Sequence, residues 1–307
     1  MDKERFYTNR RNIILLATLC CILWGSAYPA IKGGYDLFDI SSNDISGKLI
    51  FAGYRFVLAG IIVLFIQALS KKNIFVLDRK QICQVTLLGI FQTTLQYIFF
   101  YVGLSYTTGI RSSILNGTGA FFSILLAHFL YENDKLNKDK IIGCIVGFIG
   151  VIIVSLNGQN FFDSSFSIEG EGFVILAALL SSVASIYGKR LPQNQDASIV
   201  TGYQLFIGGA ILLISGYLLG GKLEGFTLKS TSLLIYMALL SSIAFAIWTQ
   251  LLKYNKIGII SIFNFLIPIF GTLLSAVFLG ENIFDIKVFI SLILVCAGIY
   301  MVYKSKN

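Results

Sequence analysis

The feature that most constrains this chain is the recurrence of apolar stretches about 20 residues long, separated by short polar segments. An apolar run of that length, wound as an α-helix, spans the hydrocarbon core of a bilayer. Only 13% of the 307 residues are charged and 56% are hydrophobic, a balance that does not suit the surface of a soluble protein. The sequence therefore predicts an all-α membrane protein with ten transmembrane helices, at residues 13–32, 49–69, 82–105, 109–131, 140–156, 169–189, 197–219, 232–252, 258–279 and 286–303.

The distribution of Lys and Arg predicts how these helices are oriented. Of the 24 basic residues, 17 lie in or beside segments that are cytoplasmic when the N-terminus is inside, and the outer loops contain only Lys48, Lys222, Lys229 and Lys287. Basic residues concentrate on the cytoplasmic side of membrane proteins. We therefore expect a multi-pass protein of the cytoplasmic (inner) membrane with both termini in the cytoplasm. The Arg10-Arg11 pair resembles a secretory signal, but nine further spans favour a retained first helix.

An internal repeat relates the two halves of the chain. GYRFVLAGIIVL at 53–64 recurs as GYQLFIGGAILL at 202–213, an offset of 149 residues. The same offset relates two further pairs of residues, Gly109 with Gly258 and Glu132 with Glu281.

Each half of this repeat contains five predicted spans, and an odd number of spans inverts the second half relative to the first. We therefore predict two inverted five-helix repeats, at 1–156 and 157–307. In transporters with this architecture, the substrate site lies near the membrane midplane between the repeats.

Three short motifs resemble the drug/metabolite transporter (DMT) superfamily: LWGSAYPAIK at 23–32, GYRF at 53–56 and FLGE at 278–281. The most similar branch is the EamA-type ten-helix exporters, which include aromatic amino-acid exporters. The first half departs from the family pattern with LYE at 130–132 and with Gly119 in place of a proline. The resemblance implies a secondary transporter whose helices 1, 3, 4, 6, 8 and 9 line a central cavity.

Polar and aromatic residues recur at helical spacing in these six spans. A polar side chain within a membrane needs a protein partner or a water-filled cavity. The candidate substrate-binding residues are Trp24, Tyr28, Arg55, Gln92, Gln96, Tyr97, Asn116, Trp248 and Asn264, and the candidate hinges are Gly117, Gly119 and Pro268. Two alternatives stay open: the amides hold helices together, and the tryptophans pack in the core rather than stack on a planar substrate.

Charges within the spans are few. All 16 Asp and Glu lie in loops or at helix ends, which leaves no mid-span carboxylate to bind a proton or a sodium ion. Arg55 lies inside the second span, where an unpaired charge costs at least ~2.5–3.5 kcal/mol. Two roles are open for it, a site for a substrate carboxylate or, as we expect, a structural pairing with Asp36, Asp39 or Asp44. For the single histidine, His128, we expect a packed, neutral imidazole.

Other function classes lack their motifs. The chain contains no H-E-x-x-H, no G-x-S-x-G and no P-loop, and its basic residues are scattered. We therefore expect no enzyme activity, metal or cofactor, no ATP-binding site and no nucleic-acid partner.

The sequence predicts a secondary transporter that moves a small zwitterionic or aromatic metabolite, such as an amino acid, by alternating access. The resemblance implies export, and the partners are this small-molecule substrate and membrane lipid. The alternative is a flippase of similar architecture for lipid or lipid-linked head groups, with an outer cluster of three cations as the head-group pocket: Lys32, Arg55 and Arg111.

Overall fold

The computed structural model describes residues 3–130, 136–155, 166–191, 196–255, 260 and 262–304, and the regular structure of these residues is helical. Glu132 and Gly258, on which part of the repeat argument depends, lie outside the described residues. In chain order the elements are α1 (Lys3–Thr8), α2 (Arg10–Leu37), α3 (Ile45–Leu69), α4 (Arg79–Gly89), η1 (Ile90–Leu95), α5 (Gln96–Tyr106), α6 (Gly109–Asn116), α7 (Thr118–Leu130), α8 (Lys138–Ser155), η2 (Ile168–Gly172), α9 (Phe173–Arg190), α10 (Ala197–Leu218), α11 (Leu228–Tyr254), η4 (Ile262–Phe265), α13 (Leu266–Leu279) and α14 (Ile286–Lys304).

Seven helical stretches in the described part of the chain are long and apolar enough to cross a membrane. They correspond to α2, α3, α4–η1–α5, α6–α7, η2–α9, α10 and α11. The other three predicted spans coincide with α8, α13 and α14; α8 begins with the charged residues KDK, and α13 has 14 residues. The structure is thus a multi-pass helical membrane protein, and the number ten stays a prediction.

Local sequence explains where two of the spans begin and break. α3 starts at Ile45, before the predicted residue 49, because the Asp44 side chain accepts a hydrogen bond from the Gly47 backbone N–H and caps the helix. The fourth predicted span is interrupted at Gly117, whose N–H bonds to Ile114 O, three residues back, rather than to the α-helical acceptor four residues back. These ends and breaks follow from capping and hydrogen bonding rather than from apolar content.

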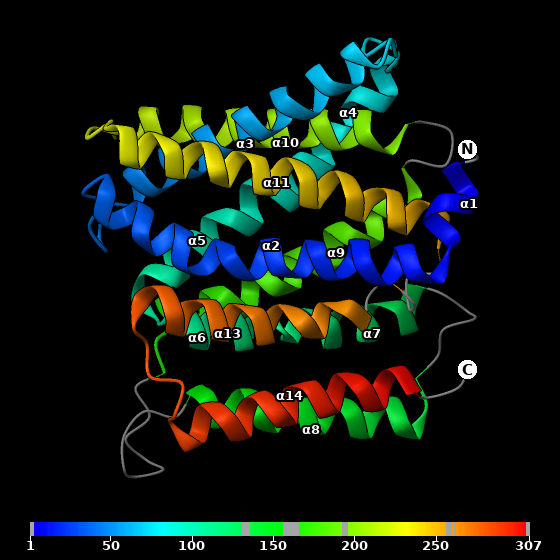
Figure 1. Cartoon of the computed structure of the whole chain (residues 1–307), viewed down its shortest axis with the longest axis vertical. Helices are drawn as coiled ribbons and strands as arrows, with labels where there is room; N and C mark the ends of the chain where they lie inside the picture. Colours follow the sequence, from blue (N-terminus) through cyan, green and yellow to red (C-terminus); the bar gives the residue numbers. More distant parts are fainter. Residues whose placement is uncertain are drawn as a thin grey trace.

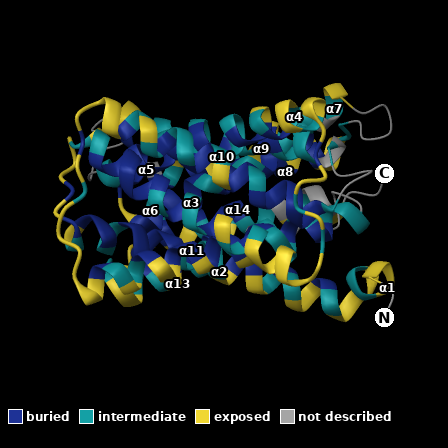
Figure 2. Cartoon of the chain, turned by 90° about the horizontal axis from the view of Figure 1, so that it is seen from above, coloured by how far each residue is buried: buried dark blue, intermediate teal, exposed yellow. Residues whose placement is uncertain are grey.

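The helices pack side by side in successive layers (Figure 1). α3, α10 and α4 lie at one end of the long axis, and α8 and α14 lie at the other. Between them come α2, α11, α5 and α9, followed by α6, α7 and α13. α1 and the last turn of α14 lie at the same end of the helices. Buried residues occupy the interior and exposed residues the outer surface (Figure 2), where large apolar side chains such as Leu218 and Val277 face outward as lipid contact requires.

Glycines bring α3 and α10 into backbone contact. A methyl group added at Gly53 would lie 2.7 Å from the Leu213 backbone nitrogen, and one added at Gly202 would lie 2.7 Å from Leu64 Cγ. The offset of 149 converts each of these contacts into the other, because it relates Gly53 to Gly202 and Leu64 to Leu213.

The next contacts along this pair are reciprocal in the same way. Gly60 approaches the Phe206 backbone nitrogen, and Gly209, its repeat counterpart, approaches that of Val57. Residue numbers rise along α3 as they fall along α10, so the two helices are antiparallel.

α8 and α14 form a second antiparallel pair of this kind. Gly150 contacts Leu294, and Gly298 contacts the backbone of Gly143 and Gly147. An offset of 148 relates Gly150 to Gly298. The same offset relates Leu294, the partner of Gly150, to a position next to Gly147, a partner of Gly298. Both helix pairs therefore pack through small residues, as tightly apposed membrane helices do.

Candidate functional site

A cavity of about 130 Å³ lies between these two helix pairs. The structure brings all the predicted site residues to its wall. The lining includes the nine candidate binding residues and the three candidate hinges: Trp24, Tyr28, Arg55, Gln92, Gln96, Tyr97, Asn116, Trp248, Asn264, Gly117, Gly119 and Pro268.

Sequence reasoning left several lining residues out of this set. Phe100 lies one helical turn after Gln96, so the same spacing argument applied one turn further would have found it. Ser182 also lines the cavity, and its hydroxyl donates to Gly119 O at 2.7 Å. An accepting carbonyl in a neighbouring helix is a tertiary contact, and it leaves no signal in the sequence of α9.

Aromatic rings form one side of the cavity. The Trp24 and Trp248 ring centroids are 4.9 Å apart in an edge-to-face arrangement, and Phe245 packs 5.7 Å from Trp24 in the same manner. Tyr28 packs edge-to-face on Phe100 at 5.4 Å. The two tryptophans thus contact each other and also line the cavity, so core packing and a surface for a planar ligand are compatible.

The polar side of the cavity is built on an irregular helix turn. η1 is a π-helical turn between α4 and α5, and it changes the phase of the helix between Gln92 and Gln96. Such turns are frequent at functional sites. In the described part of the chain, the Gln96 Oε1 atom and the Tyr28 hydroxyl, which lies by Asn116, are buried without a hydrogen-bond partner of good geometry.

Arg55 does not form the structural pairing that the sequence predicted. Its Nε donates to Ser241 Oγ at 2.7 Å and its Nη1 donates to the Tyr101 hydroxyl at 3.0 Å. Arg55 lies ten residues into α3, roughly 15 Å along the axis from Ile45, whereas Asp44 caps the start of that helix. None of Asp36, Asp39 and Asp44 forms an ion pair with Arg55 within 4.0 Å, so the expected pairing is wrong.

The three cations expected to form an outer cluster do not all lie at the cavity. Among Lys32, Arg55 and Arg111, only Arg55 lines the cavity. Arg111 Nη1 lies 3.9 Å from Glu171 Oε1, an ion pair that the charge count did not predict. At the other end of the fourth span, the His128 Nδ1 atom accepts a hydrogen bond from Leu136 N–H at 3.2 Å, and a neutral imidazole stays a prediction.

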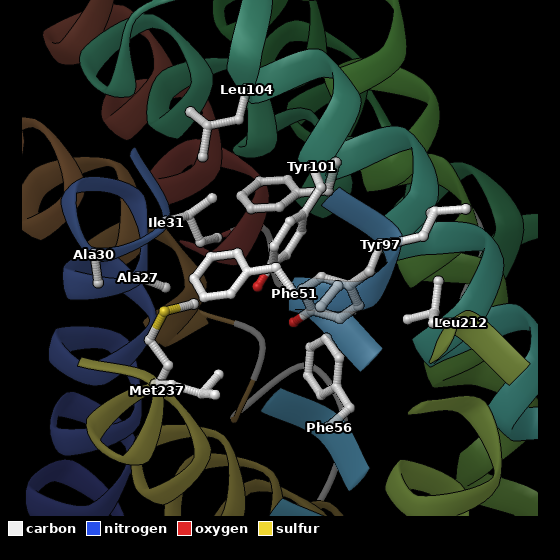
Figure 3. Close-up of a cluster of buried hydrophobic side chains, with 14 of the residues drawn as sticks. Ala27, Ala30, Ile31, Phe51, Phe56, Tyr97, Tyr101, Leu104, Leu212 and Met237 are labelled. Atoms are coloured by element: carbon white, nitrogen blue, oxygen red, sulfur yellow. The ribbon is translucent and has the colours of Figure 1, made fainter. Parts of the chain in front are cut away.

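An aromatic cluster of Phe51, Phe56, Tyr97 and Tyr101 packs beside the cavity (Figure 3), and Tyr35 belongs to the same buried cluster. Because Phe51, Phe56 and Tyr101 are fully buried, this end of the cavity is closed to solvent. Phe56 and Tyr97 have ring centroids 4.3 Å apart, and the Tyr35 hydroxyl donates to Tyr101 O at 2.7 Å. From Phe56 and Tyr97 the cluster extends through Phe51 toward the start of α3 and through Tyr101 toward the end of α5, the ends predicted to face outward. We call this closed end of the cavity the outer end.

The opposite, inner end adjoins a second cavity of about 230 Å³. The two cavities share four lining residues, Gln92, Ser185, Phe245 and Trp248. From there the second cavity reaches Lys253 and Tyr254 at the end of α11 and Glu4 of α1. The site therefore adjoins a cavity that reaches the end of the molecule at which α1 lies, and it is closed at the other end.

Comparisons with known proteins place the chain among transporters. The EamA-like transporter family matches residues 11–156 and 168–304. An uncharacterized transporter of Archaeoglobus fulgidus is 27% identical over 290 residues, which cover 94% of this chain and 96% of the relative. A probable amino-acid metabolite efflux pump of Salmonella typhimurium is 26% identical over 305 residues, 93% of each chain. A protein of known crystal structure shares the fold with a TM-score of 0.70 at 15% identity, over 95% of this chain and 96% of that one.

Proposed function

Because the chain belongs to the EamA-like transporter family, we propose that it is a secondary transporter that moves a small zwitterionic or aromatic metabolite across the cytoplasmic membrane by alternating access. The observation that carries the proposal is the central cavity, to which both halves of the sequence contribute aromatic and amide side chains. Trp24 and Asn116 come from the first half, and Trp248 and Asn264 from the second. The name of the Salmonella typhimurium relative, a probable amino-acid metabolite efflux pump, supports an amino acid as the substrate and export as the direction.

The reciprocal glycine contacts support two inverted five-helix repeats. When two antiparallel helices exchange the same contacts, a two-fold axis runs perpendicular to both of them. For helices that span a membrane, this axis lies in the membrane plane, which is the symmetry of inverted-repeat transporters. The α3–α10 and α8–α14 pairs both follow this rule, with offsets of 149 and 148 residues.

The two ends of the cavity support alternating access. The outer end is closed at the aromatic cluster, and the inner end adjoins the second cavity. With both termini in the cytoplasm, this arrangement is an inward-facing state. The reverse state requires the outer end to open and the inner end to close around the same central residues.

Four variants in proteoliposomes test the site. Trp248→Ala removes an aromatic contact worth on the order of 1 kcal/mol, and Asn116→Ala leaves polar partners unpaired at ~1–3 kcal/mol, so we expect about five- to more than hundredfold weaker substrate binding. Pro268→Ala should slow turnover more than it weakens binding, because without the proline ring η4 and α13 can join into one stiffer helix. Ile145→Ala, on the outward face of α8, is the control and should transport normally.

Amino acids and related metabolites are screened first by the rise in melting temperature that they cause in the purified protein. We expect counterflow of a stabilising metabolite to proceed without a proton or sodium gradient, since in the described part of the chain no Asp or Glu lines the central cavity. Stabilisation by phospholipid head groups alone would favour the flippase instead. Loss of transport in Ile145→Ala, with wild-type behaviour of Trp248→Ala and Asn116→Ala, would show that the site lies elsewhere.

A further inference from the structure

The central cavity has an unbalanced charge. Among the described residues, Arg55 is the one charged side chain in its lining, and it is 1% exposed. Resting on the proposed function, we infer that Arg55 is the anchor for a substrate carboxylate, and that the transporter selects its substrates by this group and not by an ammonium. The inference assigns Arg55 the ligand-binding role, in place of the structural one expected from the sequence.

The partners of Arg55 orient its charge without neutralising it. Among the described residues, the guanidinium makes two hydrogen bonds, both to neutral hydroxyls, and no carboxylate lies within 4.0 Å of its nitrogens. Ser241 donates its own proton to Met237 O at 2.9 Å, so its oxygen is free to accept from Arg55. An arginine carries five N–H donors, and the donors not engaged by Ser241 and Tyr101 remain for a planar acceptor such as a carboxylate.

Two aromatic rings, those of Phe56 and Tyr97, make cation–π contacts with the guanidinium. Its carbon lies 4.9 Å from the Phe56 ring centroid and 5.7 Å from that of Tyr97. Contacts of a cation with an aromatic face are attractive, but they supply no counter-charge. A buried arginine in a membrane protein is costly unless an anion accompanies it. In this site the anion is the substrate.

The other described residues that line the cavity provide no counter-charge for the ammonium group of a substrate. Their polar groups are amides and hydroxyls, of which the Gln96 Oε1 atom is a buried acceptor without a partner among the described residues. An amine without a carboxylate therefore meets neutral acceptors and the repulsion of Arg55. The second half contains no matching cation: Gln204, the repeat counterpart of Arg55, donates to Thr93 Oγ1 at 2.9 Å. The cavity thus has one anion subsite, which suits a monocarboxylate.

The test uses three probes that share one ring and differ in charge: L-phenylalanine, 3-phenylpropanoate and 2-phenylethylamine. Binding to the purified full-length protein is measured by calorimetry. We expect the two carboxylates to bind the wild type within about tenfold of one another, and the amine about 10- to 100-fold more weakly, the range for a hydrogen bond to a charged group.

Two variants separate the role of Arg55 from a general loss of structure. Arg55→Gln should abolish the preference for carboxylates, and Arg55→Lys should retain part of it, because the charge stays but the planar fork is lost. Lys32→Gln, which removes a cation that does not line the cavity, should keep the wild-type preference. The readout is the ratio of affinities within one variant, which partial unfolding does not alter.

The outcomes distinguish this inference from the proposed function. If the amine binds the wild type as tightly as the carboxylates, or if Arg55→Gln keeps the preference, Arg55 is structural and the inference is wrong, while the transporter proposal stands. If none of the three probes binds and phospholipid head groups do, the proposed function and the inference both fail.

Discussion

The outer and inner ends of the crossing between the fourth and ninth predicted spans differ. At the outer end, α6 packs closely on α13, with Gly271 against Ser113 and the Ser113 and Thr272 hydroxyl oxygens 3.2 Å apart. At the inner end, α7 packs on α9 and α8 instead. The two segments meet where Gly117 approaches Pro268. The α3–α10 and α8–α14 pairs keep reciprocal contacts, so the asymmetry is confined to the helices between them.

A carboxylate reinforces the closed outer end. The two oxygens of Glu281, which follows α13, accept hydrogen bonds from the backbone N–H groups of Gly109 and Ile110, both at 2.7 Å. A negative charge at a helix N-terminus also interacts favourably with the helix dipole. The comparison teaches that the α3–α10 and α8–α14 pairs, which we call the symmetric frame, keep the same contacts in both halves. The interrupted spans between them, α6–α7 and η4–α13, determine which end of the cavity is closed.

The largest effect is expected from disturbing the symmetric frame. A methyl group in Gly209→Ala would lie 2.6 Å from the Val57 backbone nitrogen, and backbone cannot yield as a side chain does. We expect about 1–3 kcal/mol of destabilisation, measured as a lower melting temperature in detergent. Gly33→Ala is the matched control: its methyl group meets nothing within 4 Å, so it should be neutral or stabilising. Equal melting temperatures for the two variants would show that α3 and α10 can move apart at Gly209 without a loss of stability.

An intermediate effect is expected from releasing the outer end. Glu281→Gln removes two charge-assisted hydrogen bonds, worth ~1.5–3 kcal/mol each. The amide oxygen can accept from one of the two backbone N–H groups, and the amide NH2 is a donor that leaves the other N–H without an acceptor. The outer end should then open more often, so an impermeant thiol reagent applied to intact cells should label a Leu104→Cys reporter roughly 10- to 100-fold faster than in the parent.

The same reporter with Glu169→Gln is the control, because Glu169 is exposed near the same end. Unchanged labelling in Glu281→Gln would remove the carboxylate from the closing mechanism. Labelling from the cytoplasmic side alone would reverse the assignment of the two ends.

The smallest effect concerns the inner end. Burial alone would raise the pKa of Asp196, but its hydrogen bond to Lys72 at 2.6 Å and the charges of Lys72 and Lys3 hold that pKa below the usual value. A carboxyl with a lowered pKa stabilises the folded state above its unfolded pKa, and this contribution is lost as the pH falls through the folded pKa.

Because the ion pairs are partly exposed, we expect less than about 1 kcal/mol. Asp196→Asn should lower the melting temperature slightly at pH 7, and the difference from wild type should vanish near pH 3. A difference that persists at pH 3 would indicate that Asp196 acts by packing rather than by charge.

The residues that line the cavity were predictable because polar side chains in an apolar helix reveal the face that avoids lipid. The periodicity placed Trp24, Asn116 and Trp248 on such faces, and the structure places all three in the lining. The motifs predicted the family correctly. The prediction for Arg55 failed because it assumed that the nearest charges along the chain are the nearest in space. Its hydroxyl partner Ser241 is 186 residues away, and only the packing of α3 on α11 brings the two together.

The tight contact between α3 and α10 has a consequence for membrane voltage. Arg55 lies on α3, and backbone contacts at Gly53, Gly60 and Gly209 prevent this helix from sliding along its neighbour. The guanidinium thus keeps one depth in the transmembrane electric field, in which moving a unit charge costs about 2.3 kcal/mol per 100 mV. A zwitterion carried past it transfers no net charge and moves at a rate that voltage does not alter. A simple carboxylate carries one negative charge, and an inside-negative potential favours its outward movement.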